Sequence, residues 1–187
     1  EHTPLFVDGL DLRKREPVKY PHVFRDHPGG ILCNVAFQQN WLRTLVSLSR
    51  VTGEAKYKEA AIDSFRFFIG RLQHPVSGLL PWGGHMYYDL LMQKAVGYQH
   101  EMKCVYPFYE LMWEISPDAT IRFIRGFFHA HMLDWSTMVF NRHGPFEGGS
   151  TKGQLTFLNT GSDLILAAAF LHTATKKWDR EHFSWAW

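Results

Sequence analysis

The sequence lacks three features, each of which would indicate a particular class of protein. Two cysteines, Cys33 and Cys104, are too few for the disulfide framework of a small secreted domain. No apolar run approaches the roughly 20 residues that a membrane-spanning helix needs. The formal net charge is only +2, so the chain as a whole gives no electrostatic reason to bind nucleic acid or a membrane. We therefore expect neither partner, and an acidic ligand would have to be held by a local cluster of basic side chains.

Aromatic side chains, by contrast, are abundant in a chain of ordinary single-domain length. The 187 residues are 45% hydrophobic, which is enough for one hydrophobic core. Aromatic residues make up 16% of the chain, among them 15 Phe and 7 Trp. Rings at this frequency are found at carbohydrate sites, where they stack on sugars, and also in cores packed from helices. The composition leaves both roles open.

Apolar residues recur with the spacing of amphipathic helices along most of the chain. In the first such segment Leu42 and Leu45 share one face, and Gly53 is placed to end the helix. Ser116 and Pro117 are a favourable start for another helix, because serine caps well and proline suits the first helical position. The pattern predicts helices over about 34–51, 54–73 and 100–115, and then from Ser116, from Gly161 and from near Trp178.

The joints between paired helices indicate a repeated architecture. They fall near Gly53, Pro117 and Lys177, a period of roughly 60 residues that is typical of stacked helical hairpins. We therefore expect an all-α fold, part of an (α/α) toroid. Residues 1–30, which are polar and rich in proline, are predicted to be an irregular lead-in. Residues 31–187 are predicted to form the toroid domain, with two long loops, 74–99 and 135–159, that emerge at one end and build a cleft.

Three short motifs in or beside those loops carry the candidate chemistry. His85, Glu101 and His143 offer two imidazoles and a carboxylate, a mixed set of nitrogen and oxygen ligands that suits Mn, Ni, Co or Zn. Calcium is less suited, because it prefers ligands that are all oxygen. Arg142 stands next to the last imidazole and can recognise an acidic substrate. Together these residues predict metal-assisted chemistry on a carboxylated sugar.

Each candidate also has a simpler explanation. His85 follows two glycines and could be a structural or solvated loop residue, and Glu101 could favour the N-terminus of the predicted third helix through its dipole. Arg142 and His143 could be a surface pair. Trp82 could stack on a sugar or lie in the core. Lys103 and Lys152 could bind substrate carboxylates or be surface residues. His100, His129 and His131 are expected to pack in the core or to support the site.

The same motifs, taken in order, resemble the family 2 polysaccharide lyases, which are pectate lyases. The matching text covers most of residues 33–172, and the ordered series is far more specific than any one motif. It runs through Phe37-Gln38-Gln39-Asn40, Gly78-Leu79-Leu80-Pro81-Trp82-Gly83-Gly84-His85, His100-Glu101-Met102-Lys103, Tyr109-Glu110-Leu111-Met112, Arg122-Phe123-Ile124-Arg125-Gly126, Asn141-Arg142-His143-Gly144, Thr151-Lys152-Gly153 and Phe157-Leu158-Asn159-Thr160-Gly161.

The resemblance implies a fold, a reaction and roles for particular residues. The family's fold is a toroid of helical hairpins, and its reaction is β-elimination on homogalacturonan with a transition metal, typically manganese. Carried over by position, His85, Glu101 and His143 are the metal ligands, and Arg142 takes the proton from the substrate. Arginine is an unusual base, because a free guanidinium has a pKa above about 12. By residue chemistry alone, stabilising negative charge is the easier role for an arginine.

Other functions stay open on the sequence alone. A metal-free epimerase or unsaturated uronyl hydrolase of the toroid type would use histidines or paired acids, and a non-catalytic carbohydrate-binding fragment would keep only the aromatic cleft. The loop between His85 and His100 is shorter than the family's, and the family's second basic residue, a lysine, is expected beyond Trp187. The chain begins at Glu1 and ends at Trp187, so we expect a piece of a longer bacterial enzyme of the periplasm or cytoplasm.

Overall fold

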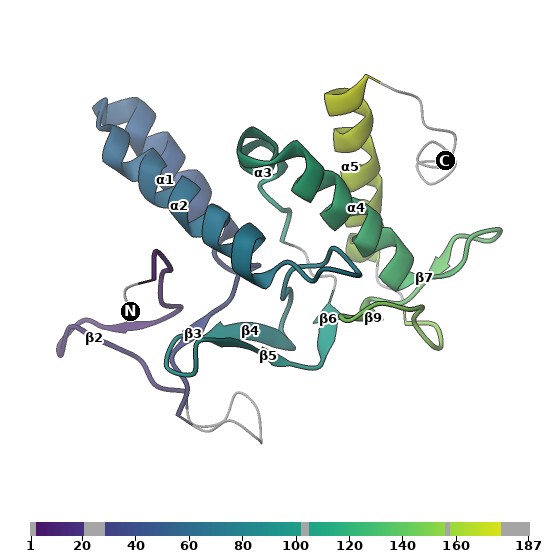
Figure 1. Ribbon diagram of the computed structural model, residues 1–187, viewed down its shortest axis with the longest axis horizontal. Helices are drawn as coiled ribbons and strands as arrows, with labels where there is room; N and C mark the ends of the chain where they lie inside the picture. Colours follow the sequence, from purple (N-terminus) through teal and green to yellow (C-terminus); the bar gives the residue numbers. More distant parts are fainter. Residues whose placement is uncertain (1–2, 21–28, 102–104, 156–157, 177–187) are drawn as a thin grey trace.

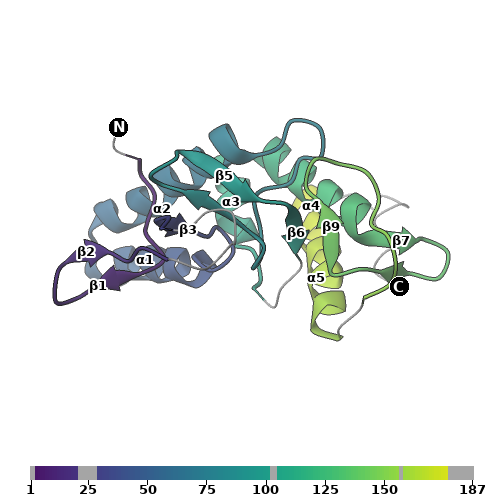
Figure 2. The same ribbon diagram turned by 90° about the horizontal axis from the view of Figure 1, so that it is seen from below.

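Helices and strands occupy opposite sides of the molecule. The computed structural model describes residues 3–20, 29–101, 105–155 and 158–176. Figure 1 shows the helices along the upper side with small sheets beneath them, and Figure 2, seen from below, places those strands in front of the helices. The helices are α1 (Gln39–Thr52), α2 (Ala55–Phe67) with a π-helical turn η1 (Phe68–Leu72), α3 (Tyr109–Ile115), α4 (Pro117–His131) and α5 (Leu158–Thr175).

The strands are short, and all of those described pair antiparallel. They form four small sheets in the described part of the chain: β1 (Leu10–Asp11) with β2 (Glu16–Pro17); β3 (Leu32–Cys33), β4 (Met86–Asp89) and β5 (Lys94–Gly97); β6 (Gln99–Glu101) with β9 (His143–Pro145); and β7 (Met132–Asp134) with β8 (Val139–Phe140). The predicted all-α fold of stacked hairpins is therefore wrong. The fold mixes helices with antiparallel sheets.

The error arose in the two segments that were predicted to be long loops. Residues 86–101 hold β4, β5 and β6, and residues 132–145 hold β7, β8 and β9. None of these strands exceeds four residues, which is too short for alternation of apolar and polar side chains to stand out. Tyr87, Tyr88 and Val96 are good strand formers, and β4 pairs with β5 locally, but the pairing of Tyr88 with Cys33 joins residues far apart in the chain. The predicted helix over 100–115 is wrong at its start, since Glu101 is in a strand and α3 begins at Tyr109.

The other described helices lie close to where the apolar pattern placed them. α1 ends at Gly53, whose φ of 75° is left-handed and whose N–H donates to the carbonyl of Ser49. α4 begins as predicted: the Ser116 side chain accepts a hydrogen bond from the Ala119 N–H, and Pro117 takes the first helical position. α5 begins three residues before the predicted Gly161, and the helix predicted from near Trp178 lies outside the described residues.

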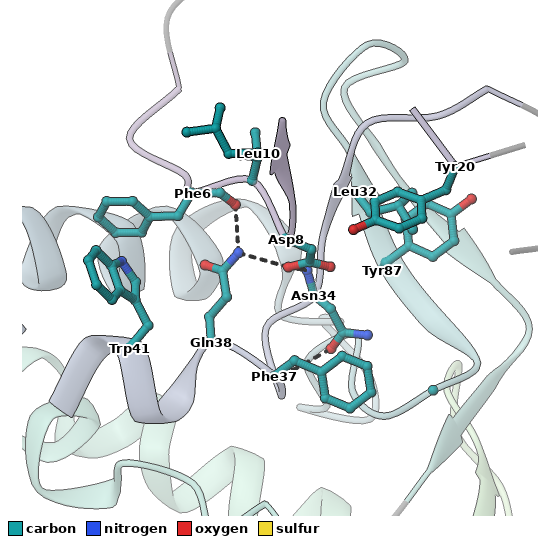
Figure 3. A pocket seen from close by; sticks show the side chains of 12 residues that line it. Phe6, Asp8, Leu10, Tyr20, Leu32, Asn34, Phe37, Gln38, Trp41 and Tyr87 are labelled. Carbon is teal, nitrogen blue, oxygen red and sulfur yellow. Dashed lines mark hydrogen bonds between the residues drawn. The ribbon is translucent and has the colours of Figure 1, made fainter. Parts of the chain in front are cut away.

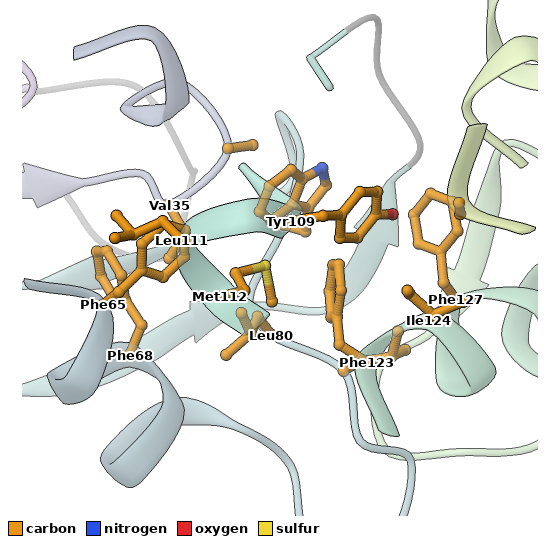
Figure 4. Packing of buried hydrophobic residues seen from close by; sticks show 14 of the residues in the cluster. Val35, Phe65, Phe68, Leu80, Tyr109, Leu111, Met112, Phe123, Ile124 and Phe127 are labelled. Atoms are coloured by element: carbon orange, nitrogen blue, oxygen red, sulfur yellow. The ribbon is translucent and has the colours of Figure 1, made fainter. Parts of the chain in front are cut away.

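The helices pack onto the strands through one main hydrophobic core. α1 contacts α2, α3 contacts α4, and α4 contacts α5. Figure 4 shows aromatic and aliphatic side chains from these helices meeting in the interior, including Phe65, Met112, Phe123 and Phe127. None of the described helices has the length and apolar character needed to cross a bilayer. Burial and the nearby Asp8 carboxylate raise the pKa of the Cys33 thiol well above its usual range, so this cysteine is a packing residue.

Candidate metal centre

Strand pairing brings Glu101 and His143 side by side. β6 and β9 pair so that Glu101 lies directly opposite His143 and His100 lies opposite Gly144. Residues opposite each other in an antiparallel pair present their side chains on the same face, with Cβ atoms about 4.5–5.5 Å apart. The two predicted loops, 74–99 and 135–159, are therefore joined where β6 and β9 pair through backbone hydrogen bonds. Glu101 is consequently on a strand, and the alternative that it favours the N-terminus of a helix through the helix dipole is wrong.

A glycine turn packs directly on Glu101 and holds its carboxylate. The Gly84 N–H donates to Glu101 Oε2 at 2.7 Å, and the Glu101 N–H donates to the Trp82 carbonyl at 3.0 Å. Gly83 has φ of 95°, and a Cβ there would lie 2.5 Å from both the Cβ and the carbonyl oxygen of Glu101. Only glycine fits this close approach. The Gly83-Gly84 pair thus fixes one oxygen of a carboxylate that is almost completely buried, and it leads directly to His85.

Three basic groups surround the second oxygen of that carboxylate. Glu101 Oε1 lies 3.5 Å from His143 Nε2, 3.8 Å from His85 Nε2 and 3.5 Å from a terminal nitrogen of the Arg142 guanidinium. The rings of His85 and His143 meet edge to face, with centroids 4.9 Å apart. The carboxylate side chain is 2% exposed, whereas those of His85 and Arg142 are about a third exposed. The acid is therefore at the base of the site, and the two basic groups are at its open side.

The geometry fits a divalent cation. Among the described residues, His85, Glu101 and His143 form one group in which an atom of each that could bind a metal lies within 4.8 Å of the others. Two ligands about 2.1 Å from one ion lie about 3.0–3.4 Å apart, for right-angled to tetrahedral coordination. The separations of 3.5 and 3.8 Å from the carboxylate oxygen are only slightly longer. The predicted convergence of the three side chains is observed, and their role as ligands remains a proposal.

His143 is prepared to present a lone pair to a cation. Its Nε2 atom is buried and makes no hydrogen bond within the described part of the chain. Burial lowers the pKa of His143, and the neighbouring Arg142 guanidinium lowers it further, against the opposing effect of Glu101. The imidazole is therefore neutral near neutral pH, the state that can bind a metal. A buried nitrogen whose lone pair accepts no hydrogen bond from the described residues supports the fit of the site to a metal.

Asn141 and Thr151 hold the backbone that carries His143. The Asn141 side chain accepts a hydrogen bond from the His143 N–H at 2.9 Å and donates to the carbonyls of Lys152 and Gly153. The Thr151 hydroxyl donates to the His143 carbonyl at 2.8 Å. These bonds join the strand to the following loop. They fix where the side chains of Arg142 and His143 begin.

The other predicted site residues have different surroundings. Trp82 is 1% exposed and packs against Phe123, with ring centroids 5.5 Å apart, so its indole is a core group here rather than a surface for stacking a sugar. Lys152 is exposed on the loop that holds Asn141, while Lys103 lies outside the described residues. Tyr98 was not among the predicted site residues. Its ring is 70% exposed and lies 5.9 Å from that of His85, and no feature of the sequence beyond its place between two motifs marked it.

A separate pocket of about 700 Å³ adjoins the glycine turn and is mainly apolar. Figure 3 shows Phe6 and Trp41 at one side, with Gln38 and Asp8 hydrogen bonded near the middle. Among the described residues that line the pocket, the charged one is Asp8, whose pKa is raised by burial. A carboxylate disfavours an anionic sugar. An acidic ligand therefore suits the side of the turn that holds Arg142.

Comparison with known proteins agrees with the site. The chain matches the family described as "Periplasmic pectate lyase" over residues 3–187. It is 36% identical over 194 residues to a protein of Dickeya dadantii (strain 3937) named "Pectate disaccharide-lyase". The match covers 89% of this chain and 35% of that relative, so the chain spans about a third of the relative's length. Because the family match extends over nearly all of its residues, the chain belongs to the periplasmic pectate lyase family.

Proposed function

We propose that the chain carries the metal-binding part of a pectate lyase that cleaves homogalacturonan by β-elimination. His85, Glu101 and His143 hold a divalent transition metal, most suitably manganese, with cobalt, nickel or zinc as other occupants. The observation that carries the proposal is the convergence of these three side chains on one point, with the Arg142 guanidinium on the same carboxylate oxygen. Family membership and the name of the Dickeya relative support pectate as the substrate class.

The donor set supports a transition metal rather than calcium. Two imidazole nitrogens and one carboxylate oxygen suit a borderline cation, whereas calcium takes six to eight oxygens. Three protein ligands leave coordination positions for a substrate carboxylate. When bound, the cation supplies Lewis-acid neutralisation of the uronate carboxylate, which makes the neighbouring C5 proton more acidic.

The proximity of Arg142 to Glu101 supports a role for Arg142 in removing that proton. Its guanidinium lies 3.5 Å from the carboxylate of the proposed metal ligand Glu101, so its planar fork of nitrogens would face a substrate carboxylate bound there. We propose that Arg142 takes the C5 proton as a neutral guanidine, the form that a nearby cation and the exclusion of water would favour. The C5–H electron pair then becomes the C4–C5 double bond, and the glycosidic oxygen on C4 leaves with its bonding pair. Burial of Glu101 beneath Arg142 and His85 keeps water from the acid and strengthens these charge interactions.

The charge of the site and the family description also support a partner and a compartment for the protein. The basic open side of the site suits an acidic polysaccharide or an oligogalacturonide. Lys152 is exposed on the adjoining loop, where it can meet a further carboxylate of the substrate. The family description favours the periplasm over the cytoplasm as the compartment.

The test is metal dependence of the complete protein on polygalacturonate, followed by ultraviolet absorbance of the new double bond. Exhaustive chelation should abolish turnover, and manganese should restore it better than calcium. His85→Ala should prevent the recovery, whereas the control His172→Ala, in the distant helix α5, should recover as the unaltered protein does. Double-bond formation that survives chelation would exclude metal assistance, and no double-bond formation with or without manganese would favour a metal-free epimerase or hydrolase.

A further inference from the structure

Two buried histidines lie on the opposite face of β6 from the proposed metal ligands. Successive side chains of a strand point to opposite faces, so His100 points away from Glu101 and into the core. Its ring packs against Phe127 with centroids 5.5 Å apart, and His100 Nδ1 lies 2.7 Å from His131 Nε2. His131 is the last residue of α4, and its Nδ1 lies 2.8 Å from the carbonyl oxygen of Asn141. Both histidines are fully buried.

The hydrogen bonds fix where the protons are. A carbonyl can only accept, so His131 Nδ1 carries a proton and donates it to Asn141. Burial lowers the pKa of both histidines, that of His131 to about 4, so both rings are neutral near neutral pH. His131 Nε2 is then an acceptor, and His100 Nδ1 must be the donor. The chain of donors therefore runs from His100 through His131 to the Asn141 carbonyl.

That carbonyl belongs to the peptide that joins Asn141 to Arg142. His131 also contacts the peptide on the other side of Asn141, because the His131 backbone carbonyl accepts from the Asn141 N–H at 2.9 Å. The Asn141 side chain in turn accepts from the His143 N–H. The orientation of this peptide therefore determines where Arg142 and His143 begin, and His100 anchors the same network to the strand that carries Glu101.

We propose that His131 is a positioning residue for the metal centre, held in one tautomer by His100, and that its hydrogen bond to Asn141 aligns Arg142 and His143 with Glu101. The inference rests on the proposed metal function of the site. His131 itself touches neither metal nor substrate. Residues that orient metal ligands typically change metal affinity about 10–100-fold when replaced.

Three substitutions of His131 distinguish the effect of its two ring hydrogen bonds from the effect of its side-chain volume. H131F keeps a ring against Phe127 and removes both bonds. H131N places an amide nitrogen where Nδ1 was, so it keeps the donor to Asn141. H131Q places its amide where Nε2 was, so it keeps an acceptor for His100 and loses the donor. F65L, on the buried face of α2, is a control that loses packing without touching the network.

The experiment is titration of the complete, metal-free protein with Mn²⁺ alone. We expect H131F and H131Q to raise the Kd for Mn²⁺ at least tenfold, while H131N and F65L stay within about threefold of the unaltered protein. An unchanged Kd in H131F, or equal rescue by H131Q and H131N, would overturn the inference and leave His131 as a packing residue.

A second measurement, hydrogen exchange without metal, tests the positioning role of His131 independently of metal binding. If the unaltered protein binds neither Mn²⁺ nor another transition metal, the proposed function fails. Hydrogen exchange of the Arg142 and His143 amides, measured without metal, then decides the positioning role. We expect exchange at least tenfold faster in H131F than in H131N or F65L. Equal exchange in all three variants would refute it.

Discussion

The close approach of Gly83 to Glu101 allows a quantitative test of how the site is built. Gly83→Ala places a side chain at φ of 95°, which costs roughly 1–2 kcal/mol for an L-residue in left-handed backbone. The new Cβ would lie 2.5 Å from Glu101 Cβ, and relieving such overpacking costs about 1–3 kcal/mol more. The free energy of unfolding should therefore fall by about 2–5 kcal/mol. Glu101 must also retreat by roughly 1 Å to reach ordinary contact.

That displacement should affect metal binding more than stability alone predicts. Ligand distances are tolerated within about 0.2 Å, so a shift several times larger should raise the Kd for Mn²⁺ more than tenfold. Denaturant unfolding in chelator and Mn²⁺ titration of the complete protein measure the two effects separately. The matched control is Gly53→Ala, with φ of 75° and no atom within 4 Å of the added Cβ. It should lose about 1–2 kcal/mol and keep its Kd. Equal stability losses with unchanged metal affinity in both variants would refute the reasoning.

Three further predictions concern individual charged groups. Arg142→Lys should lower turnover about 10²–10⁴-fold while Mn²⁺ remains bound, whereas His143→Ala should release the metal, and near-normal turnover in the lysine variant would reduce Arg142 to a screening charge. As pH falls, His131 in the unfolded chain takes up a proton near pH 6.5, whereas in the native state it does so only near its pKa of about 4. The free energy of unfolding should therefore fall by about 2 kcal/mol between pH 7 and pH 5. Urea unfolding in chelator should show no such loss in H131F. The pH dependence due to Asp163 has the opposite sign, because burial raises its pKa from 3.8 to about 7. The stability that Asp163 contributes at acid pH is lost as the pH rises to 8. Asp163→Asn should flatten that decline in the free energy of unfolding, and a parallel decline in the variant would contradict the prediction.

Much of the helical part could be predicted from the sequence because its determinants are local. The apolar face of α1, its glycine stop and the Ser-Pro start of α4 each depend on residues within one or two turns. The strands could not be predicted in the same way. Glu101 was placed at the start of a helix, yet it forms a strand because residues 99–101 pair with residues more than 40 positions away in β9.

The ligand set shows the same division. His85, Glu101, His143 and Arg142 were identified from residue chemistry and from the order of the motifs, and the structure brings them together. The roles of the residues around them were left open. Trp82 was considered for sugar binding and lies in the core, while His131 was assigned to packing or support of the site and holds the Asn141 carbonyl. A side chain's burial and its hydrogen-bond partner depend on distant segments, which local spacing does not encode.

The sequence by itself determined which atoms can bind a cation, because imidazole and carboxylate chemistry belongs to the residues, and where most of the helices lie, because the helical period is short. The tertiary structure alone decided that these atoms meet. The antiparallel register sets Glu101 against His143, and the glycine turn fixes one oxygen of the carboxylate and directs the other toward the two imidazoles. Both depend on contacts between segments separated by 17 residues or more, so they form only when the chain folds.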